Sequence, residues 1–101
     1  MGIAARALDP HSGPAGVGII LVLEQHTVYV GGLRAARAAD SSPSYPLAAL
    51  NFIKEGSATV FFAGKHAARM GDKTADEGTI TGGWPTVFIG GGTTVILNPL
   101  K

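Results

Sequence analysis

At residues 64–72 the chain reads Gly-Lys-His-Ala-Ala-Arg-Met-Gly-Asp, and two related stretches precede it. Each copy has two alanines, an arginine and an aspartate three residues after the arginine: Ala4-Ala5-Arg6 with Asp9, Ala35-Ala36-Arg37 with Asp40, and Ala67-Ala68-Arg69 with Asp72. The arginines are spaced about 30 residues apart, which is the length of a structural repeat. The sequence therefore predicts three copies of one unit.

A second pattern recurs in step with the first. Threonine, valine, an aromatic residue and one more large apolar residue precede a glycine turn in every copy: Thr27, Val28, Tyr29 and Val30; Thr59, Val60, Phe61 and Phe62; Thr86, Val87, Phe88 and Ile89. Short runs of β-branched and aromatic residues bounded by glycine favour strands. The 15 glycines and six prolines of the chain indicate that these strands are joined by tight turns.

These patterns predict an all-β fold. A unit of about 30 residues cannot bury its own apolar face, so the copies must pack around a shared axis with pseudo-threefold symmetry. We expect one domain over residues 1–101, with repeats at approximately 4–34, 35–66 and 67–97 and no appended effector domain. The helical candidates, 34–39 and 46–50, are too short to be stable alone. The last strand, Thr93 to Leu97, is expected to complete the partial first repeat and close the ring.

Composition excludes several classes of function. The net charge is +1, which favours neither nucleic acid nor an acidic membrane surface. There is no cysteine, which excludes disulfides, thiolate metal sites and cysteine nucleophiles. Residues 1–7 lack the apolar segment of a signal peptide, and the longest apolar run, Val17 to Leu23, is far too short to span a membrane, so we expect synthesis in the cytoplasm. Gly90 to Gly92 lacks the spacing of a phosphate-binding loop, and Asp9, His11 and Ser12 are too close in sequence to form a catalytic triad. We expect no enzymatic activity and no small-molecule substrate.

The two phased patterns resemble those of PAAR-repeat proteins. That family's unit ends in Asn-Gly-Lys-Pro-Ala-Ala-Arg followed by Gly-Asp, and the nearest local match is residues 64–72, with His66 in the place of the usual proline. Arg34 takes that place in the preceding copy. The resemblance spans roughly residues 4 to 97. It implies a small three-sided β cone made of three repeats, with a flat base and a sharp apex.

The resemblance also implies a function. Family members cap and sharpen the trimeric β-helical central spike of a contractile injection machine, such as a phage tail, a tailocin or type VI secretion, and pierce the target envelope. We expect one cap per spike trimer and delivery to the outside by contraction. We predict that three strands contact the spike: Thr27 to Val30, Thr59 to Phe62 and Thr86 to Ile89. Strand addition would pair their backbone edges with the unpaired strand edges at the end of the spike and bury apolar side chains. The alternatives are a β-repeat binding module for cargo or a receptor, and a domain that self-assembles through its strand edges.

Two further sets of residues are candidates for a role. Arg37 with Asp40, and Arg69 with Asp72, are predicted to be structural ion pairs, because a guanidinium can hold a carboxylate together with strand-end carbonyls. The family typically holds an apical zinc or iron ion with His and Cys from the loops after each aspartate. Here only His11 lies in such a loop, and a zinc site needs three or four ligands. We therefore expect no metal, with His11 as the first ligand if one binds, and we expect His26 and His66 at the surface.

Overall fold

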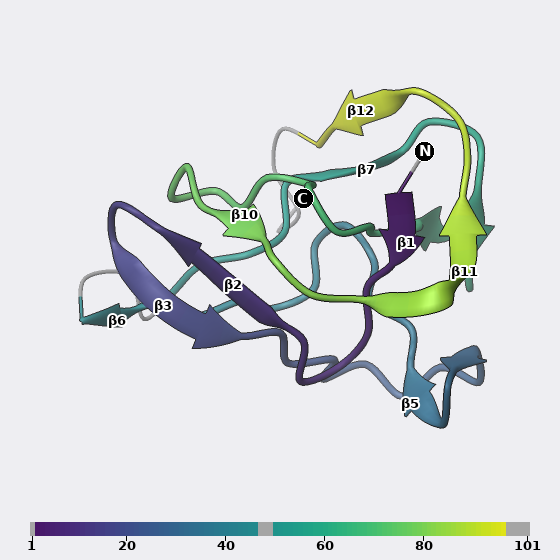
Figure 1. Ribbon diagram of the computed structural model, residues 1–101, viewed down its shortest axis with the longest axis horizontal. Coiled ribbons are helices and arrows are strands. Elements are labelled where there is room, and N and C mark those ends of the chain that lie inside the picture. Colours follow the sequence, from purple (N-terminus) through teal and green to yellow (C-terminus); the bar gives the residue numbers. More distant parts are fainter. Residues whose placement is uncertain (1, 47–49, 97–101) are drawn as a thin grey trace.

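The computed structural model describes residues 2–46 and 50–96, and in this part of the chain there are strands and turns but no helix (Figure 1). The strands are short because glycine and proline interrupt nearly every apolar run. Their bounds are β1 (Gly2–Ala4), β2 (Pro10–Gly13), β3 (Gly16–Ile19), β4 (Tyr29–Val30), β5 (Leu33–Arg34), β6 (Tyr45–Pro46), β7 (Glu55–Ser57), β8 (Phe61–Phe62), β9 (Lys65–His66), β10 (Thr79–Ile80), β11 (Trp84–Ile89) and β12 (Thr93–Val95). The predicted all-β class is confirmed. Residues 34–39 do not form a helix, and residues 47–49 of the other helical candidate lie outside the described residues.

The three Ala-Ala-Arg segments meet in a closed ring of backbone hydrogen bonds. The amide of Ala5 donates to the carbonyl of Ala68 at 3.0 Å, Ala68 donates to Ala36 at 3.0 Å, and Ala36 donates to Ala5 at 2.9 Å. Each copy thus uses the same amide and the same carbonyl toward its two neighbours. This arrangement is what three equivalent segments around a common axis require.

The same order continues in the turn after each arginine. The amides of Leu8, Ala39 and Gly71 donate to the carbonyls of three isoleucines, each at 2.8 Å: Ile20, Ile53 and Ile80. The three donors all have positive φ, at 72°, 82° and 97°. A left-handed backbone costs a non-glycine residue free energy, so only the third copy, with Gly71, adopts this turn without strain.

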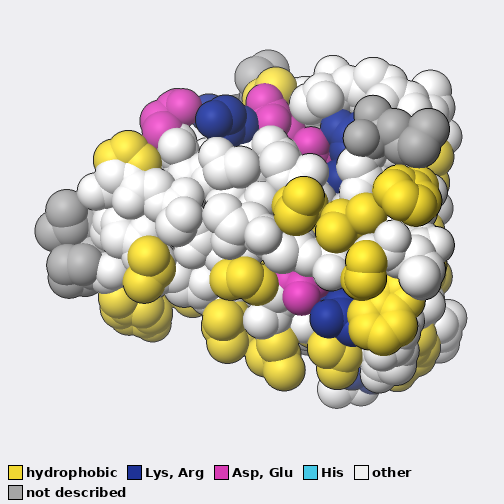
Figure 2. Space-filling model, viewed as in Figure 1, with side chains coloured by type: hydrophobic (Ala, Val, Ile, Leu, Met, Phe, Trp, Pro, Cys, Tyr) yellow, Lys and Arg dark blue, Asp and Glu magenta, His cyan; other side chains and the backbone are white. Residues whose placement is uncertain are grey.

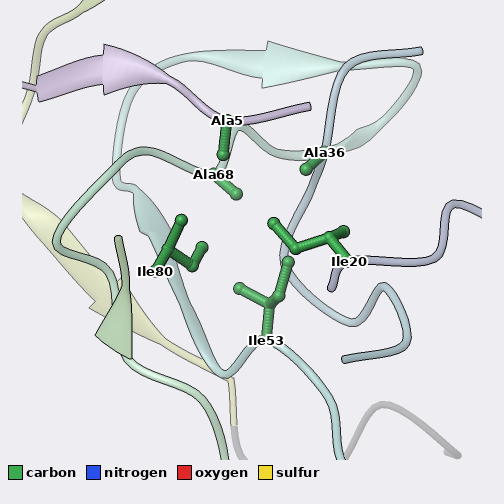
Figure 3. Packing of buried hydrophobic residues seen from close by; sticks show 6 residues of the cluster. All are labelled: Ala5, Ile20, Ala36, Ile53, Ala68 and Ile80. Carbon is green, nitrogen blue, oxygen red and sulfur yellow. The ribbon is translucent and has the colours of Figure 1, made fainter. Parts of the chain in front are cut away.

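The first core cluster is formed by the ring alanines and by three isoleucines that pack against them. Ala5, Ala36 and Ala68 pack against Ile20, Ile53 and Ile80, and all six side chains are at most 1% exposed (Figure 3). Alanine suits the ring because the three backbones approach too closely for a larger side chain. A second cluster lies on the other side, where Ala4, Ala35 and Ala67 contact Val30 and Ile89. The repeats therefore share two cores and do not fold separately.

The N-terminal strand closes the ring, which corrects the prediction made for the last strand. β5 pairs with β4 and β9 pairs with β8, whereas β11 has β1 in the equivalent place, with Ile3 opposite Phe88. β12 instead pairs with β7 of the middle repeat. The reason is that the chain continues past Gly92 without another Ala-Ala-Arg segment, so the edge of β11 is free for residues from the other end of the chain. Leu97 lies outside the described residues.

The molecule is wider at one end than at the other (Figure 2). Strands β2, β3 and β6 form the narrow end, while β11, β1 and β5 lie at the wide end (Figure 1). The loops that follow Asp9 and Asp40 lead into β2 and β6, so they belong to the narrow end, which we call the apex. None of the residues in the described ranges belongs to a helix long and apolar enough to cross a membrane.

Candidate docking face and apex

Three strand pairs at the wide end present one aromatic residue each. Tyr29 faces Arg34, Phe61 faces His66 and Phe88 faces Ile3 across the respective pairs. Two tight turns set the first two pairs, because Gly31-Gly32 and Ala63-Gly64 have positive φ at both central positions, as a two-residue hairpin requires. The predicted four-residue strands are shorter in the first two copies and longer in the third.

The two faces of these strands differ in burial. Tyr29, Phe61 and Phe88 are 54%, 52% and 62% exposed, although aromatic side chains are usually covered. Val28, Val60 and Val87 pack, partly buried, against the second core cluster, and Val30 and Ile89 belong to it. The alternation follows from the period-two geometry of a strand. We call Tyr29, Phe61 and Phe88 with their strands the docking face, and apolar side chains gather at this wide end in Figure 2.

The residues opposite the three aromatics are not the same. The guanidinium of Arg34 lies 5.4 Å from the centroid of the Tyr29 ring, which is a cation–π contact. The rings of Phe61 and His66 lie 4.4 Å apart, and Phe88 has the aliphatic Ile3 opposite. The docking face is thus threefold in backbone and in aromatic positions, but not in the chemistry around them.

The predicted Arg–Asp pairs are formed, each within its own repeat. Arg69 contacts Asp72 at 2.9 Å, and its guanidinium also donates to the carbonyl of Gly91 at 3.1 Å and to Thr93 Oγ1 at 2.8 Å. Arg37 lies 3.5 Å from Asp40 and 3.4 Å from the carbonyl of Ala63. Each arginine therefore links the turn after its own segment to the glycine turn near the wide end. All four side chains of the two pairs are buried.

The backbone explains why the aspartate stands three residues after the arginine. The amide of Arg37 donates to Asp40 Oδ2 at 2.7 Å, and the amide of Asp40 donates back to the carbonyl of Arg37 at 3.1 Å. Arg6 with Asp9 and Arg69 with Asp72 repeat this turn. Arg6 contacts Asp9 at 3.3 Å and lies over the ring of Trp84 at 4.7 Å. Sequence reasoning placed Arg6 in the series without giving it a role.

Glu24 is a site residue that sequence reasoning missed. Its carboxylate contacts Arg37 at 2.9 Å and Lys65 at 3.4 Å, and thereby joins the first repeat to both ends of the second. A hydrogen bond from Arg37, with the charges of Arg37 and Lys65, lowers the pKa of Glu24. Glu24 has no counterpart in the repeated pattern, so no periodic signal could have identified it.

The histidines are less exposed than expected. His26 is 7% exposed, and its Nε2 lies 2.9 Å from the carbonyl of Ala35 while Nδ1 accepts a hydrogen bond from the Val28 amide. His66 is partly buried, with Nδ1 2.7 Å from the carbonyl of Ser57. The prediction of surface positions is wrong for His26 because its ring satisfies backbone groups between β4 and the Ala-Ala-Arg segment.

His11 lies buried at the apex, with 1% of its surface exposed. Burial lowers its pKa, against the opposing attraction of Asp76. The residues that the structure describes contain no group of three or more His, Cys, Asp or Glu side chains able to hold a metal ion. One imidazole and one carboxylate are too few for zinc or iron, which take three or four protein ligands. The donor set at the apex does not fit the metal that the family resemblance implies.

No curated protein matches the chain at a significant level. A family model described as the PAAR motif matches residues 9–81, which cover most of the chain and include the second and third Ala-Ala-Arg segments. This chain therefore belongs to the PAAR-motif family, whose members are spike-tip proteins of contractile injection systems that associate with the spike.

Proposed function

We propose that this protein caps the end of a trimeric β-helical spike, one copy per trimer, and leads that spike through the target envelope. The ring of Ala5, Ala36 and Ala68 is the single observation that carries the proposal. A monomer with three equivalent segments around an axis can offer one equivalent surface to each chain of a trimer. A partner with twofold symmetry, or none, would use only part of that surface.

The docking face has the chemistry such contact needs. The end of a β-helical spike exposes apolar side chains and unpaired strand edges, and both are costly to leave in water. Tyr29, Phe61 and Phe88 would cover apolar surface at three equivalent points, and aromatic residues commonly dominate the free energy of such interfaces. Arg34 and His66 add polar groups at two of these points, which favours one rotational setting of the cap on the spike.

Piercing requires stiffness and no chemistry. The hydrogen-bonded ring and the two shared cores connect every repeat to the other two, and the buried Arg–Asp pairs brace the turns within the second and third repeats. Force applied at the wide end is thereby transmitted to the apex through short, paired segments. The protein acts as a structural part and not as an enzyme.

The test is the stoichiometry of the complex with the cognate spike. Native mass spectrometry of the purified mixture should show one copy of this protein per spike trimer. Aspartate at Tyr29, Phe61 and Phe88 together should abolish binding while circular dichroism stays native, because these side chains are exposed. A matched triple variant places aspartate at Ile19, Leu23 and Tyr45, exposed apolar residues outside the docking face, and should bind normally. Three caps per trimer, or unchanged binding of the first triple variant, would refute the proposal.

One observation favours the binding-module alternative. A groove of about 460 Å³ lies between the first and second repeats, within the size range of ligand sites, and its lining includes Leu23, Asp40, Phe52 and Lys65. If cargo docks in this groove, Leu23→Asp should release the cargo and leave spike binding intact. Co-purification of cargo and spike with this single variant separates the two functions.

A further inference from the structure

The three loops of the apex bury a polar residue at the same position. The second residue after each repeat aspartate is His11, Ser42 or Thr74, and each is at most 1% exposed. Apolar side chains would be expected at buried positions, so three polar ones need partners. The hydrogen bonds that these residues and their neighbours make therefore show what holds the three loops together.

Hydrogen bonds around Asp76 organise the third loop. The hydroxyl of Thr74 donates to Asp76 Oδ1, and the amide of Gly78 donates to Asp76 Oδ1 at 3.0 Å and to Thr74 Oγ1 at 3.1 Å. Burial opposes ionisation of Asp76, but hydrogen bonds to its side chain, chiefly from Thr74 and with Gly78 among them, outweigh it and lower the pKa of Asp76. The carboxylate is therefore charged at neutral pH and accepts strong hydrogen bonds.

Asn51 connects this loop to the second one. Its Oδ1 accepts a hydrogen bond from the Asp76 amide at 3.1 Å, and its Nδ2 donates to Ser44 Oγ at 3.3 Å. Asn51 itself is 6% exposed, and its bond to Ser44 is buried, while the bond from Asp76 is partly buried. The backbone adds a second link, because the Ala75 amide donates to the carbonyl of Phe52 at 2.8 Å.

The first loop joins the others by strand pairing. β2 lies between β10 and β3, with Ser12 opposite Thr79 and His11 opposite Ile80. β3 in turn pairs with β6 of the second loop, through Val17 and Tyr45. All three loops are thus connected through protein groups alone.

Some buried atoms at the apex lie outside this network. Within the described residues, both ring nitrogens of His11, the hydroxyl of Ser42 and Oδ2 of Asp76 have no hydrogen-bond partner. Atoms of this kind are commonly satisfied by internal water. Because one imidazole gives a metal only one nitrogen, His11 and Asp76 together offer one nitrogen and one carboxylate oxygen. The residues outside the described ranges contain no His, Cys, Asp or Glu that could add a ligand.

We propose that the apex of this protein is closed by the hydrogen-bond network of Asn51, Thr74, Asp76 and Ser44 in place of the metal ion that its family resemblance implies. The proposal concerns the isolated protein, so its failure would leave the capping function untouched. A failure of capping would likewise leave it intact. It predicts that apex order depends on Asp76 and not on metal.

The first experiment measures metal in the wild-type protein, purified without a His tag. Elemental analysis should find zinc and iron far below one equivalent, and neither EDTA nor added zinc should shift the Tm. A specific zinc site filled well above its dissociation constant would raise the Tm by roughly 10 °C or more in a domain of this size. Such a shift, or a stoichiometric metal lost in His11→Ala, would overturn the proposal.

The second experiment measures hydrogen exchange in Asp76→Asn and in the matched control Glu77→Gln. Glu77 is the neighbouring carboxylate, but it is exposed and pairs only with Lys54 in the described structure. Exchange of the amides at positions 76 and 78 should be at least roughly tenfold faster in Asp76→Asn, because the hydrogen-bond network that holds these amides loses its charged acceptor. The control should exchange like the wild type. Unchanged protection in Asp76→Asn would overturn the proposal; if that variant does not fold, the metal measurement on the wild type still decides.

Discussion

Arg37→Met should be strongly destabilising, because it leaves a buried carboxylate without its partner. The Arg37 side chain is 0% exposed and that of Asp40 is 4% exposed, so water cannot replace the lost contact. Removing one partner of a buried pair costs about 3–5 kcal/mol. A domain of this size has about 5–15 kcal/mol of stability, so the variant should lose much of it, with a Tm roughly 12 °C or more lower.

A double-mutant cycle tests the cause of that loss. Asp40→Asn keeps the shape of the side chain and removes the charge, so Arg37→Met with Asp40→Asn should be less destabilised than the sum of the two single variants. We expect a coupling free energy within the range of about 0.5–3 kcal/mol that contacting residues show. Glu24→Gln is the control, because Glu24 is 56% exposed and such contacts contribute about 0–1 kcal/mol.

The pH dependence supplies an independent check. Burial raises the pKa of Asp40, although the hydrogen bond from the Arg37 amide and the Arg37 charge oppose the shift. The native state then binds more protons than the unfolded state between the ordinary aspartate pKa and the raised one, so this group's contribution to stability falls as pH rises through that window. Without the guanidinium the window widens, and chemical denaturation should show that acid pH partly rescues Arg37→Met. A loss that is independent of pH, with a coupling free energy near zero, would refute the reasoning.

Two more predictions concern the core and the turns. Ile53→Ala should lower the free energy of unfolding by about 2–5 kcal/mol, measured by urea denaturation, because it opens a cavity beside the alanine ring, whereas Ile19→Ala, at an exposed position, should cost far less. Ala39→Gly should raise the free energy of unfolding by up to about 1 kcal/mol, and the Tm with it, because φ at Ala39 is 82° and glycine adopts that conformation without strain. The neighbouring Ala38→Gly is the control and should lower the Tm. A lower Tm for Ala39→Gly would show that the turn is not strained.

Features that depend on neighbours in the chain could be predicted from the sequence. The Arg-x-x-Asp spacing reports a turn in which the arginine amide reaches the carboxylate three residues later, and this geometry is the same in all three copies. The glycine turns and the alternation between Val28 and Tyr29 are also local, because strand pleating and positive φ are set within a few residues. Repetition of such local signals was sufficient to identify the family.

Contacts between distant segments required the tertiary structure. The pairing of β1 with β11, the meeting of Glu24 with Arg37 and Lys65, and the burial of His11 all join residues that no periodic pattern relates. The symmetry of the repeats predicts that an edge of β11 must be covered, but the strand that covers it depends on where the two chain ends lie in space. The repeated unit and its turns are therefore readable from the sequence, whereas the strand that covers β11 and the side chains that become buried depend on packing, because burial and long-range pairing involve all the repeats at once.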